Sequence, residues 1–557
     1  MIHERFFLLH KIVGAIHELP LHTNQIGLLY INEPSKPLGV FYNCDRKIER
    51  NTKELFMVQH LRSLGLATLF VLTPLTIPVQ LSVAQAQTTP SQISEVSKAD
   101  RLLQEANQLA ESKSTLLEAL PKYRDALGIY QKQGNPVRTL AVRQKFEAAF
   151  VAARPLLSKQ EQEIRKASNE LFKRYPAKTT NDTAKKLKAI AATKLGFALW
   201  SDTKSPSEIS KEQAKAYEAI RKPLDDYLKL QARGINQPIP ENLRSFLATH
   251  AVALKEVQTL LLTEDIPQWE MDLTHLQKGD ITVPLPSFLG LTNLNKLLLL
   301  DTLDKFQQYK NEEGIKSFDA AWRLRLSLNG DPRLISQLVN LIIARSQVGV
   351  IRNLDGIPLE WQKRLRQFDH AAALLTSIEM ESFAIFAGYN EIFKASAEFP
   401  ITLQLDWGNW STSMRQDYWR WLNIYLNQSS RRVYAQLPKL DACNGDIKSA
   451  IALETTINNY DIVASPSWVN QWVKGKKMML QLELTEKVLG VREAIAKSKL
   501  PKSIPSALSV ACPSSKWNYS VMPEKVTISL SPTPDALTKS EDDLAYSYTI
   551  SIKAPRE

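Results

Sequence analysis

The chain has 557 residues, of which 44% are hydrophobic and 23% charged, and its formal net charge is +12. This composition excludes disordered, collagen-like and disulfide-dense proteins, and the length leaves room for roughly two to four globular units. Only 19 residues are glycine, which disfavours sheet-rich folds and glycine-rich phosphate-binding loops. We therefore expect a mostly helical protein.

Residues 1–56 contain two short apolar patches but no sustained period. They predict a poorly ordered extension, or a start codon assigned too early, with translation beginning at Met57.

Residues 57–86 are typical of a secretory signal peptide. A short basic stretch precedes an apolar run, and the small residues Ala84 and Ala86 stand directly before Gln87. We expect cleavage after Ala86, so that Gln87 begins the mature chain.

The apolar run also allows an alternative, in which residues 64–83 stay in the chain and anchor it to the inner membrane. Pro74 and Pro78 interrupt this run. A spanning helix needs about 20 uninterrupted apolar residues, so the interruptions favour the cleaved signal.

Export would leave two of the three cysteines, Cys443 and Cys512. An oxidising compartment allows them to form one disulfide, and two free buried thiols are the alternative. The exported chain stays basic, which predicts a protein or an anionic envelope polymer as partner, whereas export disfavours nucleic acid. We expect a periplasmic or secreted protein that meets a membrane only through its signal or anchor segment.

The rest of the chain divides by its periodicity. Residues 87–98 predict a polar linker, 99–263 a first helical domain, 264–290 a linker rich in proline and glycine, and 291–500 a second helical domain. In 501–557, alternating and β-branched segments at 516–521, 526–530 and 546–552 predict two or three short strands. The expected fold class is mostly α, with repeat-like or bundle helical domains and a small C-terminal antiparallel β tail.

Two apolar stripes, over 99–110 and 119–130, predict an antiparallel helix pair. Ala119, Tyr123 and Ala126 have the small, aromatic, small spacing of the second helix of a tetratricopeptide repeat, and Ala106 lies near the small position of its first helix. The segment resembles the single tetratricopeptide-type hairpin that follows the signal in many exported cyanobacterial proteins. The pattern does not recur, so later helices must cover the exposed face of this hairpin.

The stretch from Leu291 to Leu530 resembles a group of uncharacterised exported bacterial proteins, in which a helical body leads into a short terminal hairpin. The matching parts are residues 331–339, beginning Asp331-Pro332-Arg333, and residues 512–519, beginning Cys512-Pro513. This resemblance implies the architecture and export, and no activity.

No motif in the sequence predicts a catalytic or metal site. His250, His275 and His370 lack the spacing of paired metal ligands, although Asp272 lies three residues before His275. Ser201 and Lys204 fit an S-x-x-K pattern without its K-T-G partner, which indicates a chance match. We therefore expect no cofactor and no metal.

An aromatic cluster is the strongest candidate for ligand binding. It includes Trp407, Trp410, Tyr418, Trp419, Trp421 and Tyr425, and the helically spaced pair Trp468 and Trp472 follows it. Indole rings suit stacking on sugar rings, and Trp407, Trp410, Trp419 and Trp421 are the candidate stacking residues. The alternative is that these rings fill the core, which their single-face spacing favours.

Residues 315–366 carry a local excess of positive charge that could dock an acidic partner, or could be the solvated side of amphipathic helices.

Taken together, the sequence predicts an exported cell-envelope protein that binds or scaffolds and does not catalyse. The rival hypothesis is an enzyme that binds or processes envelope glycan, with the aromatic cluster and acids such as Glu379 and Glu381. Those two carboxylates stand at i and i+2, on different sides of a helix, and so do not support the rival.

Overall fold

The computed structural model describes residues 90–199, 208–280, 288–395, 411–441, 443, 446–458, 468–497, 507–533 and 546–552. The predicted extension, signal peptide and anchor, including Ala84, Ala86 and Gln87, lie outside these residues. Trp407, Trp410, Ser201 and Lys204 lie outside them as well. The described residues from Ala99 onward belong to one compact unit.

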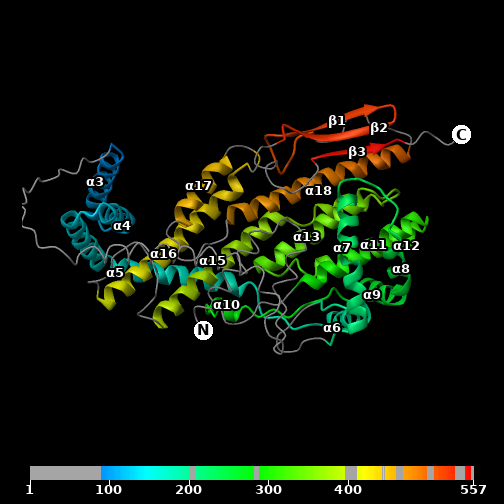
Figure 1. The fold of residues 1–557 in the computed structure, drawn as a ribbon, viewed down its shortest axis with the longest axis horizontal. Coiled ribbons are helices and arrows are strands. Elements are labelled where there is room, and N and C mark those ends of the chain that lie inside the picture. The colour runs from blue at the N-terminus through cyan, green and yellow to red at the C-terminus, as the bar shows by residue number, and fades with distance from the viewer. Residues whose placement is uncertain are drawn as a thin grey trace, which may run out of the picture. The chain divides into compact units, whose positions relative to one another are not determined.

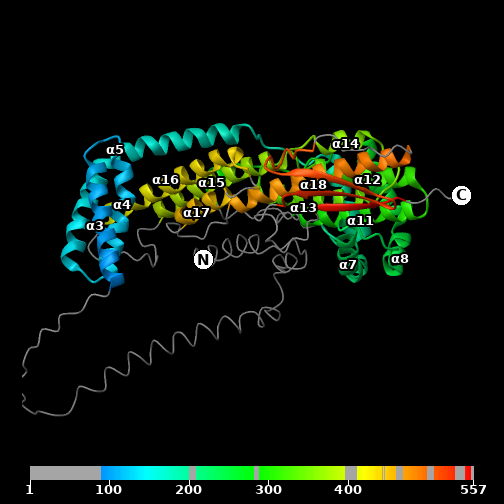
Figure 2. The same ribbon diagram turned by 90° about the horizontal axis from the view of Figure 1, so that it is seen from above.

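The fold is mostly helical, as the sequence predicts. The described part of the chain begins with α3 (Pro90–Ala110), so most of the linker expected over 87–98 is helical, and α4 (Leu116–Lys132) and the long α5 (Pro136–Lys173) follow. At the start of α5 the Asn135 side chain accepts a hydrogen bond from the Arg138 amide, and Pro136 occupies the first helical position. α4 and α5 pack on each other, and α5 lies alongside α16 (Figure 2).

The next helices along the chain are α6 (Asp182–Ile190), which continues into a π-helical turn (Ala191–Leu195), α7 (Lys211–Ala232), α8 (Glu241–Thr249), α9 (Ala251–Thr263), α10 (Thr274–Gln277), α11 (Leu289–Gln307), α12 (Asn311–Leu326), the apolar α13 (Leu334–Ile351) and α14 (Glu360–Leu365). α13 packs against α7, α11, α12, α15 and α18. It is therefore the element around which the core is built.

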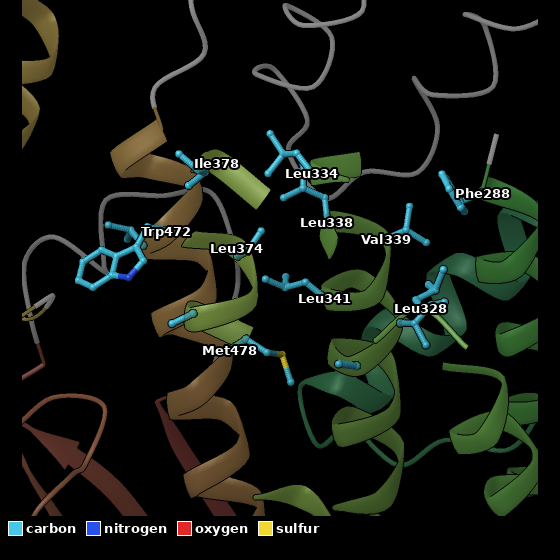
Figure 3. Packing of buried hydrophobic residues seen from close by; sticks show 14 of the residues in the cluster. Phe288, Leu328, Leu334, Leu338, Val339, Leu341, Leu374, Ile378, Trp472 and Met478 are labelled. Atoms are coloured by element: carbon cyan, nitrogen blue, oxygen red, sulfur yellow. The ribbon is translucent and has the colours of Figure 1, made fainter. Parts of the chain in front are cut away.

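The remaining helices are α15 (His370–Ala395), α16 (Thr412–Gln436), which ends in a 3-10 turn (Leu437–Lys439), α17 (Asp446–Asn458) and α18 (Trp468–Ala496). Figure 3 shows apolar side chains of α13 and of two of these helices converging, with Leu338 and Leu341 on α13, Leu374 on α15 and Met478 on α18. All four side chains are buried, so hydrophobic burial holds these helices together.

The predicted β tail is confirmed as a three-stranded antiparallel sheet in the order β1–β2–β3. Its strands are β1 (Lys516–Met522), β2 (Lys525–Ser531) and β3 (Ser547–Ser551). Alternate residues such as Trp517, Ile528 and Tyr548 are buried, while the intervening residues face outward. The sheet lies against α18 (Figure 1), which covers its apolar face.

The segment 264–290 does not separate two independent helical bodies. α9 precedes it and packs on α12, α7 packs on α13, and α5 packs on α16. Helices from both sides of the expected linker therefore share one core, and the proline and glycine residues of this segment shape a connection inside a single compact unit.

Candidate functional site

The members of the aromatic cluster that the structure describes lie in the interior. Trp421 and Trp419 are only 2% and 9% exposed, and Tyr418 is fully buried. The Trp421 ring packs edge-on against Phe146 and Phe150 of α5, with centroids 6.4 and 5.6 Å apart. Trp419 and Trp421 are therefore core residues. The prediction that they stack on sugar rings is wrong, because protein covers the faces of their rings.

The neighbouring aromatic residues follow the same pattern. Tyr418 packs edge-on against Phe150 at 6.0 Å, and Tyr425 stacks on Trp421 at 5.6 Å. Burial raises the pKa of the Tyr418 hydroxyl. Trp468 and Trp472 are also buried. The aromatic residues joining α16 to α5 thus hold two distant parts of the chain together.

The two cysteines after the predicted cleavage site form a disulfide. Cys443 lies between α16 and α17, Cys512 lies just before β1, and their Cα atoms are 5.5 Å apart. Asp441 supports both sides of this bond, because its carboxylate accepts hydrogen bonds from the amides of Cys443 (2.8 Å) and Ser514 (3.0 Å). The disulfide therefore ties the β tail to the helical body.

The carboxylate of Asp441 and the two sulfur atoms lie within 4.8 Å of one another. A metal would need the sulfurs as thiolates, and in the disulfide they are bonded to each other. This trio is therefore a covalent link with a hydrogen-bonded acidic neighbour.

A second link between the tail and the body is the partly buried Glu483 of α18. Its carboxylate accepts hydrogen bonds from Ser509 Oγ (2.8 Å), the Ala511 amide (2.6 Å) and Trp517 Nε1 (2.9 Å). These three donors lie in β1 and in the loop before it. The single side chain of Glu483 therefore fixes this loop and the start of β1 to α18.

A third link involves β3. The Tyr548 hydroxyl donates a hydrogen bond to the carbonyl of Arg352 (3.2 Å), at the end of α13. Arg352 is buried and donates to Thr485 Oγ1 and to both the carbonyl and the side chain of Gln481, each at 2.7 Å. Burial lowers the pKa of Arg352 to about 10. Gly234, with φ +78°, leaves room for the Tyr548 ring, which a Cβ would meet at 2.9 Å.

His250, His275 and His370 are each buried or partly buried in the fold. Both ring nitrogens of His250 lie within hydrogen-bond distance of oxygens, Phe246 O at 2.8 Å and Gln213 Oε1 at 2.7 Å. Burial, with a smaller effect from nearby Arg325, holds the pKa of His370 well below its usual value. Burial also lowers the pKa of His275, although Asp272 opposes this shift.

A cluster of charged side chains at the start of α13, formed by Asp331, Arg333 and Glu381, was not predicted from the sequence. The Asp331 carboxylate accepts hydrogen bonds from the Arg333 amide (3.0 Å) and from its Nε (2.9 Å). Burial raises the pKa of Glu381 of α15, and a hydrogen bond from the Leu334 amide and the charge of Arg333 oppose the rise. The sequence could have indicated the Asp331-Pro332-Arg333 turn, because Asp331 bonds to a residue only two positions away. The position of Glu381 near this turn depends on the packing of α15 against α13.

The two acids of the rival hypothesis have different environments. Glu379 lies near Arg431 of α16, with 3.8 Å between the charged atoms, while Glu381 faces the start of α13. The two carboxylates therefore do not face one common space, in agreement with their i, i+2 spacing.

The basic segment 315–366 is not a continuous docking face. Arg325, Arg333 and Arg352 are buried, and Arg364 pairs with Asp319 at 2.5 Å and with Glu360 at 2.8 Å. Arg325 lies over the Trp322 ring at 4.0 Å, and burial lowers its pKa to about 9. Several of the positive side chains in this segment therefore lie in the core or pair with acidic side chains of this chain.

Two stretches among the described residues, Leu334–Ile351 and Glu360–Glu391, are long and apolar enough to cross a membrane by length and composition alone. In each stretch, more than half of an apolar window of 18 residues is buried inside this protein. That burial is expected for helices at the centre of a compact unit.

Comparisons of the chain with protein-family models, curated proteins and solved structures found no match. The arguments below therefore rest on the chain's own residues.

Proposed function

We propose that this protein is exported and acts in the cell envelope by binding or scaffolding rather than by catalysis. The observation that carries the proposal is the disulfide between Cys443 and Cys512. Disulfides form and persist in oxidising compartments and are rare in the cytosol. The signal-like segment 57–86 points to the same compartment by an independent route.

A scaffolding role also agrees with where the polar and aromatic chemistry lies. The aromatic rings of α16 contact α5, the described histidines are held by burial or hydrogen bonds, and Glu483 joins the β tail to the body. These groups stabilise the protein itself. The partner is then a protein or an anionic envelope polymer, as the net charge of +10 on residues 87–557 favours.

The test of export uses the full-length chain expressed in a bacterium and separated into cytosolic and envelope fractions. We expect the envelope fraction to hold a protein whose N-terminus is Gln87 and whose cysteines resist alkylation until a reductant is added. The matched variant Leu69→Arg interrupts the apolar run, and we expect it to stay in the cytosol with Cys443 and Cys512 both reactive. A wild-type protein found in the cytosol with reactive thiols would refute the proposal.

The test of scaffolding is crosslinking in intact cells, followed by identification of what is attached. A protein or envelope polymer recovered with wild type but not with the Leu69→Arg variant supports the proposal. Turnover of a glycan by the purified protein would overturn it in favour of the rival enzyme.

A further inference from the structure

Reduction of the disulfide would turn Cys443, Cys512 and Asp441 into three potential metal ligands. One carboxylate oxygen of Asp441 and the two sulfur atoms lie within 4.8 Å of one another. Two electrons and two protons break the S–S bond and leave two thiols, which bind zinc after they lose their protons. Zinc bound tetrahedrally at about 2.3 Å from each sulfur holds the two sulfurs roughly 3.8 Å apart. Rotation about the Cα–Cβ bonds reaches that separation, because the two Cα atoms are 5.5 Å apart.

The two segments that carry these cysteines are joined by contacts other than the disulfide. The Asp441 carboxylate accepts hydrogen bonds from the amide of Cys443 at 2.8 Å and from the amide of Ser514 at 3.0 Å. Cys443 belongs to one segment and Ser514 to the loop of Cys512, so this carboxylate bridges the two. We therefore expect the sulfurs to remain neighbours after the bond between them is broken.

Cys512 is also fixed within its own loop. Its amide donates a hydrogen bond to Ser509 Oγ at 2.9 Å, and its carbonyl accepts one from the Ser515 amide at 2.8 Å. Ser509 Oγ in turn donates to the Glu483 carboxylate of α18 at 2.8 Å. The Cys512 side chain is fully buried. A ligand held in this way loses little freedom when it binds a metal.

Asp441 can bind a metal and keep its hydrogen bonds. Each of its two oxygens accepts one amide hydrogen bond, and a carboxylate oxygen has a second lone pair for a cation. Hydrogen bonds of this kind orient the carboxylates that ligate metals. The residue is partly exposed, so an ion can reach it from solvent. Two thiolates and a carboxylate carry three negative charges and favour a divalent cation, whereas Cu(I) prefers sulfur ligands alone.

We infer that the reduced form of this protein binds one Zn²⁺ ion through Cys443, Cys512 and Asp441. Among the described residues the ligand group has these three members, and water takes the fourth position, as in other accessible zinc sites. The ion and the disulfide use the same sulfurs, so each form excludes the other. A dithiol reductant opens the site, and an oxidant that takes two electrons from the thiolates closes it and releases the ion. The inference concerns the reduced protein in any compartment, so it and the proposed export can fail independently.

The test uses full-length protein that has been reduced with a phosphine and freed of excess reductant under nitrogen. Co²⁺ is the probe, because tetrahedral cobalt bound to thiolates absorbs strongly in the near ultraviolet and in the visible range. We expect this absorption to saturate at one Co²⁺ per chain and to be abolished when Zn²⁺ displaces the cobalt. The oxidised protein, whose sulfurs are bonded to each other, should not develop it.

Variants assign the ligands. Cys443→Ser and Cys512→Ser should each reduce the near-ultraviolet absorption by at least about half, because each removes one of the two sulfurs. Cys44→Ser is the matched control for the remaining cysteine and should keep the full absorption.

Asp441→Asn should weaken Zn²⁺ binding at least about 10-fold, measured by competition with a chelating dye. Glu524→Gln, at an exposed acid in the turn between β1 and β2, is its matched control and should bind like wild type. Circular dichroism of the oxidised variants checks that each is folded. Reduced wild type without the cobalt absorption would overturn the inference, and so would absorption that depends on Cys44. Unchanged Zn²⁺ affinity in Asp441→Asn would overturn the three-ligand site.

Discussion

Replacement of Glu483 by alanine should detach the β tail from α18. Glu483 accepts hydrogen bonds from Ser509 Oγ, the Ala511 amide and Trp517 Nε1 at 2.6 to 2.9 Å. Trp517 is 2% exposed and Ala511 5%, so water cannot easily replace the lost carboxylate at either donor. Each buried donor left without a partner costs about 1–3 kcal/mol.

The Ser509 hydroxyl can rotate to a new acceptor, so two of the three donors decide the magnitude. We expect the free energy of unfolding to fall by roughly 3–5 kcal/mol, part of the loss being recovered by local relaxation. Glu483→Gln keeps the shape and one acceptor oxygen but loses the charge, and should show a smaller loss.

The assay is denaturant unfolding followed by circular dichroism, with the disulfide intact. Glu486→Ala is the matched control on the same helix, because Glu486 pairs with the largely exposed Arg366. An exposed ion pair contributes less than about 1 kcal/mol. Equal losses in Glu483→Ala and Glu486→Ala would refute the view that Glu483 anchors the sheet.

Three further predictions concern the disulfide, a histidine and the aromatic core. Cys443→Ser with Cys512→Ser opens a link of sequence separation 69, and chain entropy gives a loss of about 4 kcal/mol in unfolding free energy, measured against reduced and oxidised wild type. Burial depresses the pKa of His370 in the folded protein, so as the pH falls the imidazole is protonated in the unfolded chain before it is protonated in the folded one. The free energy of unfolding should therefore decrease as the pH falls below about 6.5, by at most about 1.4 kcal/mol per pH unit. His370→Gln should flatten that part of the stability curve, and an unchanged slope would contradict the assignment. Trp421→Ala should cost about 3–5 kcal/mol in chemical unfolding because it leaves a cavity against Phe146 and Phe150; a loss below 1 kcal/mol would contradict its place in the core.

Local chemistry made several elements predictable. The alternation of residues such as Val526, Ile528 and Leu530 predicted a strand, and the structure buries all three under α18. Similarly, Asn135-Pro136 marks the start of α5 because a side-chain acceptor and a missing amide both suit a helix N-terminus. Such features depend on neighbours in the chain, which the sequence displays directly.

Features that join distant residues were not predictable in the same way. Glu483 and Trp517 are 34 residues apart, and nothing in either segment singles out the hydrogen bond between them. Likewise, Arg325 and Arg352 look like surface cations in the sequence, but stacking on Trp322 and hydrogen bonds to Thr485 allow their burial. The aromatic spacing around Trp421 was consistent with a core or a ligand, and only the position of α5 decides between them.

Apolar content alone also misjudges which helices face outward. α13 is apolar enough to suggest a membrane span, yet it is surrounded by five other helices and lies mostly inside the protein. α5 is less apolar overall, because its second half is rich in charge, yet Val137 and Val151 stand in the solvent. The distinction depends on whether neighbouring helices cover each side. For α13 the chain supplies those neighbours itself, whereas Val137 and Val151 of α5 stay exposed.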